Sequence, residues 1–122
     1  MVLAKPTEAQ EQGALVRWWS VACRQYGLPA FALYHIPNEG SGSAIRGRHL
    51  REQGVRSGCP DLSLDVPRGK YHGLRIEMKR KGGRVSAAQL EFLSWLEGQG
   101  YRTGVCFGWT EAKDLILDYL RG

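Results

Sequence analysis

Apolar residues recur at intervals of three and four positions in three stretches of the chain, a spacing typical of helices that bury one face. Each stretch follows a hydroxyl side chain that can cap a helix: Thr7, Ser86 or Thr110. The predicted helices span residues 7–26, 86–98 and 110–120. In the middle helix we expect four apolar residues to face the core: Leu90, Leu93, Trp95 and Leu96.

Four shorter stretches have the composition or the alternation of β-strands, over residues 30–36, 61–65, 73–79 and 101–107. The first is expected to be buried because it is aromatic and aliphatic, and it ends at Pro37-Asn38. A turn at Pro67-Arg68-Gly69-Lys70 joins the second and third strands into a hairpin. A helix separates the third and fourth strands, and such a crossover allows them to lie parallel. The sequence therefore predicts an α/β fold, a mixed four-stranded sheet flanked by helices, in one domain over residues 1–122.

Residues 38–58 interrupt this pattern with glycines interleaved with basic residues, and we expect a long loop with at most one short helical turn. A loop of this length in a small domain usually has a function. The net charge of +5 indicates a surface that attracts polyanions. We expect basic residues here and after the third strand to follow a phosphate backbone: Arg46, Arg48, Arg51, Arg56, Arg80, Lys81 and Arg84.

Cysteine usage and hydropathy favour a cytoplasmic protein. Cys23, Cys59 and Cys106 lack the spacing of a zinc site, and we expect them to be reduced thiols. No apolar stretch approaches the roughly 20 residues of a membrane span, so no membrane association is expected.

Two short clusters, Pro60-Asp61 and Glu77-Met78-Lys79, carry the candidate chemistry. As neighbouring strands they would bring two carboxylates and an ammonium together. Residues two apart in a strand share a face, so Arg75 projects with Glu77 and Lys79. Burying such a charged row costs several kcal/mol unless the charges pair or bind a metal.

A hard cation such as Mg²⁺ takes oxygen ligands and keeps several waters, so two carboxylates are an adequate protein contribution. Asp61 and Glu77 are the predicted metal ligands, with the backbone carbonyl of Met78 as a further candidate. Lys79 would orient or deprotonate a water, or stabilise charge on the phosphate. For the Glu-x-Lys triplet alone, a solvent-facing row of charges is the alternative interpretation.

The stretch from Gly58 to Gln89 resembles the VRR-NUC domain of the PD-(D/E)XK nuclease superfamily. The resemblance rests on motifs in the family's order: Gly58, Pro60-Asp61, Glu77-x-Lys79, Lys81-Gly82-Gly83-Arg84, Ser86 and Gln89. It implies a restriction-endonuclease-like core and a Mg²⁺ or Mn²⁺ cofactor. It also implies that Gln89 reaches the site to hold a water or a phosphate.

The resemblance extends to the first helix, where the family carries a glutamate four residues before a glutamine. Glu8 and Gln12 match that spacing, and Glu11 lies on nearly the same helical face. Both glutamates are kept as candidates to complete the metal shell.

The resemblance implies a structure-selective endonuclease acting on branched DNA, of the Holliday-junction resolvase type, in a bacterial or phage-infected host cell. It also implies a homodimer, because a symmetric junction offers two equivalent strands. Four tryptophans are candidates for the dimer interface, with core packing as the alternative: Trp18, Trp19, Trp95 and Trp109. A flap or nicked-duplex nuclease with the same site, or a non-catalytic DNA-binding module, remain alternative functions.

Overall fold

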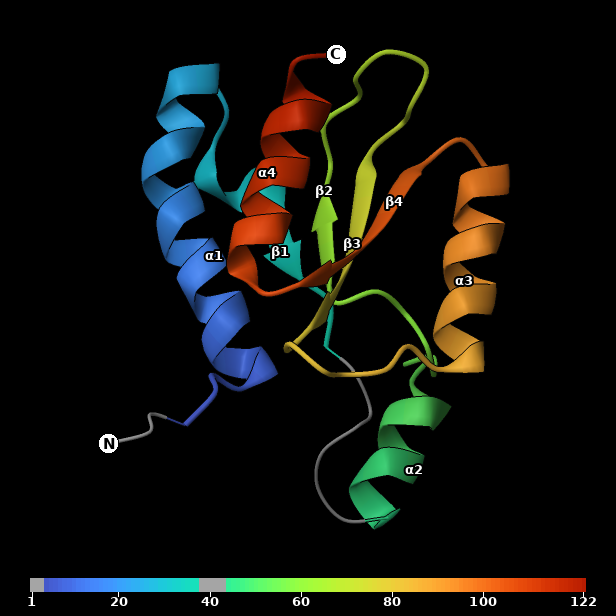
Figure 1. The fold of residues 1–122 in the computed structure, drawn as a ribbon. Helices are drawn as coiled ribbons and strands as arrows, with labels where there is room; N and C mark the ends of the chain where they lie inside the picture. Colours follow the sequence, from blue (N-terminus) through green and yellow to red (C-terminus); the bar gives the residue numbers. More distant parts are fainter. Residues whose placement is uncertain (1–3, 38–43) are drawn as a thin grey trace.

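The computed structural model describes residues 4–37 and 44–122. The helices are α1 (Glu8–Ala22), α2 (Ala44–Glu52), α3 (Ala87–Gly98) and α4 (Trp109–Leu120), as labelled in Figure 1. The strands are β1 (Leu33–His35), β2 (Leu62–Leu64), β3 (Leu74–Lys79) and β4 (Arg102–Phe107). Short 3-10 helices cover Cys23–Tyr26 and Ala30–Ala32.

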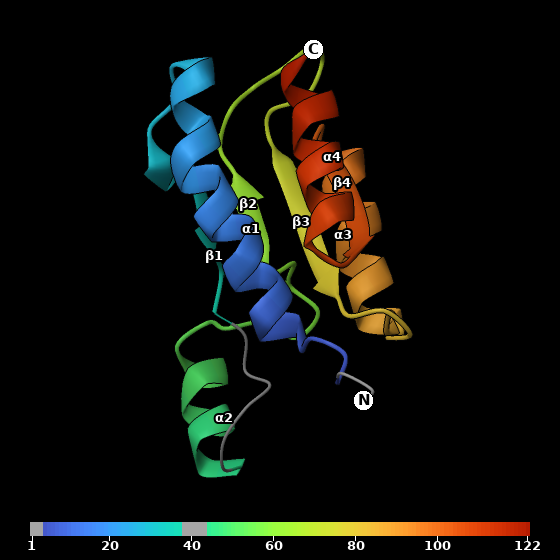
Figure 2. The same ribbon diagram turned by 60° about the vertical axis from the view of Figure 1, so that its left-hand side comes forward.

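The strands form a mixed sheet in the order β1-β2-β3-β4. β2 pairs antiparallel with both β1 and β3, which confirms the predicted hairpin. β3 and β4 pair parallel from Leu74 opposite Arg102 to Lys79 opposite Phe107, as the crossover through α3 predicted. α1 and α4 lie side by side on one face of the sheet, and α3 lies on the other face (Figures 1 and 2).

The main core lies between the sheet and the helix pair α1 and α4. Leu74, Ile76 and Met78 of β3 point into it and are fully or almost fully buried. Leu15 and Trp19 of α1 meet them there, in the same cluster of buried residues. Because alternate residues of a strand face opposite sides, this packing turns Arg75, Glu77 and Lys79 toward the α3 side of the sheet.

Two of the three predicted helix caps are confirmed. Thr7 and Ser86 each accept a hydrogen bond from a backbone N–H three residues on, and the side chains of Gln10 and Gln89 accept one from the backbone N–H of the cap residue. The third was wrong: α4 begins at Trp109 after Gly108, whose φ of +99° suits glycine, and Thr110 lies inside the first turn.

The predicted strand over residues 30–36 is shorter and more exposed than expected. Its first half is the 3-10 turn Ala30–Ala32, which is fixed where the carbonyl of Ala30 accepts a hydrogen bond from Trp19 Nε1 at 2.9 Å. Phe31 is 82% exposed, and β1 lies at the edge of the sheet with two exposed residues. An apolar run of strand length does not distinguish an edge strand from a central one.

The predicted loop contains a nine-residue helix, α2. Residues 38–43, including Asn38 of the predicted strand end, lie outside the described residues. The first helix also ends earlier than predicted, because the 3-10 turn Cys23–Tyr26 replaces its last turn before Gly27.

In α3, Leu93 and Leu96 are buried as predicted, but Leu90 and Trp95 are 55% and 62% exposed. Only part of the apolar face of α3 packs against the sheet, and Leu90 and Trp95 lie outside that contact. Among the other tryptophans, Trp19 belongs to the core, and Trp18 and Trp109 pack against it. Cys23 and Cys106 are buried free thiols and Cys59 is partly buried. In the described part of the chain, no helix combines the length and the apolar character needed to cross a bilayer.

Candidate functional site

The candidate site lies at one end of the sheet. Antiparallel pairing of β2 and β3 places Asp61, just before β2, beside Met78 near the end of β3. The first turns of α1 and α3 reach the same end of the molecule (Figures 1 and 2). Segments separated by up to about 80 residues in sequence therefore converge on one place.

Asp61 is held in place by its side chain and its backbone. Its Oδ2 accepts a hydrogen bond from the backbone N–H of Met78 at 2.7 Å. Its carbonyl oxygen accepts the N–H of Ile36 at 2.7 Å and lies 2.9 Å from His35 Nδ1. The end of β1 therefore holds the backbone of Asp61 through Ile36 and His35, and Met78 holds its carboxylate.

Glu77 is the most deeply buried acidic residue of the site, at 2% exposure. Its Oε1 accepts a hydrogen bond from Gln89 Nε2 at 2.9 Å and lies 3.9 Å from Lys79 Nζ. Its Oε2 is buried and has no hydrogen-bond partner among the residues that the structure describes. Burial, reinforced by the nearby Asp61 carboxylate, raises the pKa of Glu77 to about 8.

Glu8 and Glu11 have different surroundings. Glu8 Oε1 lies 4.0 Å from Lys79 Nζ, so the lysine stands between Glu8 and Glu77. Glu11 Oε2 instead accepts the backbone N–H of Trp109 at 2.9 Å, at the start of α4. The structure thus places Glu8 with the other site residues, whereas Glu11 supplies the cap that α4 lacks from its own Gly108.

Gln89 joins the cap of α3 to the carboxylates. Its Oε1 accepts the backbone N–H of Ser86 at 2.8 Å, and this fixes the amide so that Nε2 points at Glu77. The Ser-x-x-Gln capping box thus has a role that sequence reasoning missed. A capping box in which the glutamine is also a site candidate is the signal that could have revealed it.

Gly58 was predicted only as part of a motif, and the structure explains why this position requires glycine. Its φ is +82°, and a Cβ at this position would lie 2.6 Å from the carbonyl oxygen of Ala88. The backbone before Asp61 therefore packs directly on the first turn of α3, where any side chain would collide.

The donor set fits a hard divalent cation. Two carboxylates converge, and the unpaired Oε2 of Glu77 is the kind of buried acceptor that a cation satisfies. No group of three or more His, Cys, Asp and Glu side chains arranged to hold a metal occurs in residues 4–37 and 44–122. Because a cation that retains waters needs few protein ligands, Asp61 and Glu77 remain the candidate pair. Met78 contributes its N–H to Asp61, and the use of its carbonyl as a ligand stays a prediction.

The predicted nucleic-acid-binding residues lie in two segments at the same end as the carboxylates (Figure 1). One is α2 with the residues that follow it, and the other connects β3 to α3. All seven are exposed: Arg46, Arg48, Arg51, Arg56, Arg80, Lys81 and Arg84. The two segments give the site a positive border on a strongly exposed surface.

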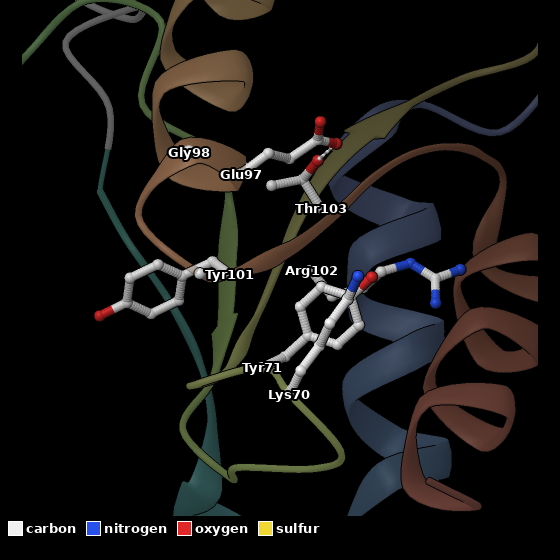
Figure 3. A pocket seen from close by; sticks show the side chains of 8 residues that line it. Lys70, Tyr71, Glu97, Gly98, Tyr101, Arg102 and Thr103 are labelled. Carbon is white, nitrogen blue, oxygen red and sulfur yellow. Dashed lines mark hydrogen bonds between the residues drawn. The ribbon is translucent and has the colours of Figure 1, made fainter.

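A cavity of about 490 Å³ lies at the opposite end of the sheet, where β3 and β4 begin (Figure 3). Lys70, Tyr71 and Arg102 line it, and Thr103 donates a hydrogen bond to Glu97 on its wall. It shares no residue with the site around Asp61 and Glu77.

Comparison with known proteins identifies a related family. The sequence model of the VRR-NUC domain matches residues 7–109. A solved structure described as a VRR_NUC domain protein is similar to this chain with a TM-score of 0.83 and 28% sequence identity, covering 98% of this chain and 92% of its own. A search of curated proteins gave no match.

Proposed function

The chain belongs to the VRR-NUC domain family, a nuclease family, and we propose that it is a Mg²⁺- or Mn²⁺-dependent endonuclease that hydrolyses phosphodiester bonds in branched DNA. The observation that carries the proposal is the pair of carboxylates at the end of β3. Burial, followed by the charge of Asp61, raises the pKa of Glu77, whose Oε2 has no hydrogen-bond partner in the described structure. Two such carboxylates repel each other when both are ionised, and a divalent cation between them would relieve that repulsion.

Asp61 and Glu77 would hold the cation, with Glu8 and the carbonyl of Met78 as further oxygen donors. When bound, the cation would lower the pKa of a coordinated water and neutralise charge on the phosphate. Gln89 keeps Glu77 in position through the hydrogen bond at 2.9 Å. Asp61 is held by the Met78 N–H, so both carboxylates are oriented before a substrate arrives.

Lys79 supplies positive charge beside the carboxylates. Its Nζ lies 3.9 Å from Glu77 Oε1 and 4.0 Å from Glu8 Oε1, and its side chain is mostly buried. A fixed ammonium in such a place stabilises negative charge that develops on phosphate oxygens. We assign this role to Lys79, with orientation of the attacking water as the second.

The substrate is proposed to be branched DNA, with a four-way junction as the preferred form. Support comes from the two basic segments that border the site, since exposed arginines and lysines hold a phosphate backbone without reading bases. A homodimer would match the two equivalent strands of a junction. Sedimentation at a mass of two chains is the expected result for the protein in solution.

The test is cleavage of a fluorescent four-way junction, a flap and a linear duplex with Mg²⁺, with Mn²⁺ and with EDTA. Asp61→Asn, Glu77→Gln and Lys79→Ala are each expected to lower the cleavage rate by about 100-fold or more, because each removes a group that acts in the transition state. Binding of the junction in EDTA should change little. Asp118→Asn is the matched control, since Asp118 is an exposed carboxylate that faces Arg102 at the far end of β4.

Three results would overturn parts of the proposal. Cleavage in EDTA at the rate seen with Mg²⁺ would show that the reaction does not depend on a metal. Full activity of Glu77→Gln would show that cleavage does not require the carboxylate pair. Binding of DNA without cleavage under any of these conditions assigns the chain to the non-catalytic DNA-binding module.

A further inference from the structure

The outer surface of α3 carries a hollow beside an exposed tryptophan. The hollow has a volume of about 470 Å³ and is called the α3 hollow here; it is lined by Arg56, Ser57, Ala88, Glu91, Phe92 and Trp95. Trp95 is 62% exposed, and Phe92 lies one turn before it on the same helix and is partly buried. The hollow thus combines two aromatic rings with one positive and one negative side chain.

The α3 hollow lies beside two segments that carry site residues. Ala88 on its wall directly precedes Gln89, which donates a hydrogen bond to Glu77. Phe92 and Trp95 also line a neighbouring hollow of about 510 Å³ that reaches Cys59, two residues before Asp61. A DNA strand bound in the hollow would therefore lie beside the segments that carry Gln89 and Asp61.

Gly58 fixes the rim of the α3 hollow. The backbone of Gly58 packs against the carbonyl of Ala88 so closely that a Cβ would lie 2.6 Å from that oxygen. Arg56 and Ser57, just before this contact, are thereby held against the first turn of α3. Figure 1 shows the segment after α2 reaching this end of α3.

We propose that the α3 hollow receives an unpaired nucleobase of the DNA, which stacks on Trp95 while Arg56 contacts its phosphate. This inference rests on the proposed nuclease function. Aromatic faces bind unpaired bases of any sequence, and a guanidinium adds charge and planar stacking. The carboxylate of Glu91 accepts hydrogen bonds from exocyclic amines, so an amino-bearing base fits better than thymine.

The size and charge of the α3 hollow favour a nucleotide over a second copy of the chain. Its volume lies within the range of about 300–1,000 Å³ typical of small-ligand pockets. Glutamate is depleted at protein interfaces, whereas Glu91 lines this hollow. The substrate would accordingly carry an unpaired nucleotide near the bond that is cut.

The experiment measures DNA binding in EDTA, where no metal-dependent cleavage occurs, by fluorescence anisotropy. Two DNA duplexes are compared that differ only by one extrahelical cytosine. Wild type should bind the bulged duplex more tightly. Trp95→Ala should weaken binding of the bulged duplex about 10-fold and of the paired duplex less than 2-fold. Trp95→Phe should retain most of the preference, because phenylalanine also stacks.

Leu90→Ala is the matched control, because Leu90 is an apolar residue of α3 with 55% exposure that does not line the hollow. It should leave both affinities unchanged. Equal weakening of both duplexes by Trp95→Ala, or no preference of wild type for the bulge, overturns the inference. Conversion of a dimer to a monomer by Trp95→Ala in sedimentation also overturns it and assigns the surface to self-association. Failure of wild type to cut any DNA with Mg²⁺ overturns the proposed function but leaves this binding comparison valid.

Discussion

The surroundings of Glu77 change the ionisation of its carboxyl group. It is 2% exposed, and burial followed by the charge of Asp61 raises its pKa from 4.5 to about 8. In the unfolded chain the same group ionises near its ordinary value. The folded protein without metal therefore favours the protonated form, and its stability from this group is fully present below pH 4.5 and is lost as the pH rises toward 8.

The residue-scale prediction compares wild type and Glu77→Gln in EDTA. Between pH 5 and pH 8 the free energy of unfolding should decrease more for wild type than for the variant. The difference should be on the order of 2 to 5 kcal/mol, since one unit of pKa corresponds to about 1.4 kcal/mol. Urea unfolding at the two pH values measures the difference. Adding Mg²⁺ at pH 8 should stabilise wild type and leave Glu77→Gln unchanged. Identical pH dependence of the two proteins would contradict the burial argument.

The proximity of Asp61, Glu77 and Lys79 could be predicted from the sequence because strand alternation and a hairpin fix their relative positions. The burial of Glu77, its hydrogen bond from Gln89 and the close packing of Gly58 could not be predicted. These depend on where α3 lies against the sheet, and the pattern of the helix alone does not specify that contact. The choice between Glu8 and Glu11 also stayed open, because both lie on nearly the same face of α1 and the sequence does not show which of them faces β3.

At the scale of elements, α1 acts through two glutamates of its first turn. Glu8 faces Lys79 at the end of β3, and Glu11 accepts the N–H of Trp109 at the start of α4. The N–H of Gly108 also donates to the carbonyl of Lys79 at 2.9 Å. One helix thus holds both the end of β3 and the start of α4, although its first contact is electrostatic and its second is a helix cap.

The matched variants Glu8→Ala and Glu11→Ala separate these two contacts. Glu11→Ala should lower the free energy of unfolding by about 1–2 kcal/mol, the usual effect of losing a helix cap, while the folded protein still cuts DNA. Glu8→Ala should change stability by less than about 0.5 kcal/mol, because an exposed ion pair contributes little. It should lower the rate of Mg²⁺-dependent cleavage at least about 10-fold. Urea unfolding and junction cleavage measure the two effects, and a reversed pattern would make Glu11 the site residue.

Helices with a capping box and strands joined by a short turn were predicted closely, because their signals are local. The start of α4 was missed because its cap comes from Glu11, 98 residues earlier in the chain. β1 was expected to be buried because its apolar composition does not reveal that it has a neighbour on one side only. α2 was missed because glycines and arginines lack an apolar stripe.

At the scale of the whole molecule, positive charge gathers at the end that holds the carboxylates. α2 and the segment between β3 and α3 both present exposed basic residues there. Substrate binding and cleavage are therefore expected to depend on different residues, with binding carried by this border and chemistry by the groups within it.

The double variant Arg46→Ala with Arg48→Ala tests this division. DNA affinity should fall, and the slope of log K against log salt concentration should decrease by about 2, because each phosphate contact contributes about 0.9. Anisotropy titrations between 50 and 200 mM NaCl give the slope. Lys70→Ala with Arg121→Ala removes two exposed charges away from the site and serves as the control. An unchanged slope in the first double variant would place the DNA elsewhere.

Gly58 separates α2 from the chemistry that follows it. Its backbone is seated on the carbonyl of Ala88, and only three positions later comes the carboxylate that meets Met78. Exchange of α2 should accordingly leave Asp61 in place, whereas the end of β1 has to stay because His35 and Ile36 contact the backbone of Asp61. If the chain is the nuclease proposed above, substitutions in α2 would therefore change which DNA it binds while Asp61 keeps its position beside α3.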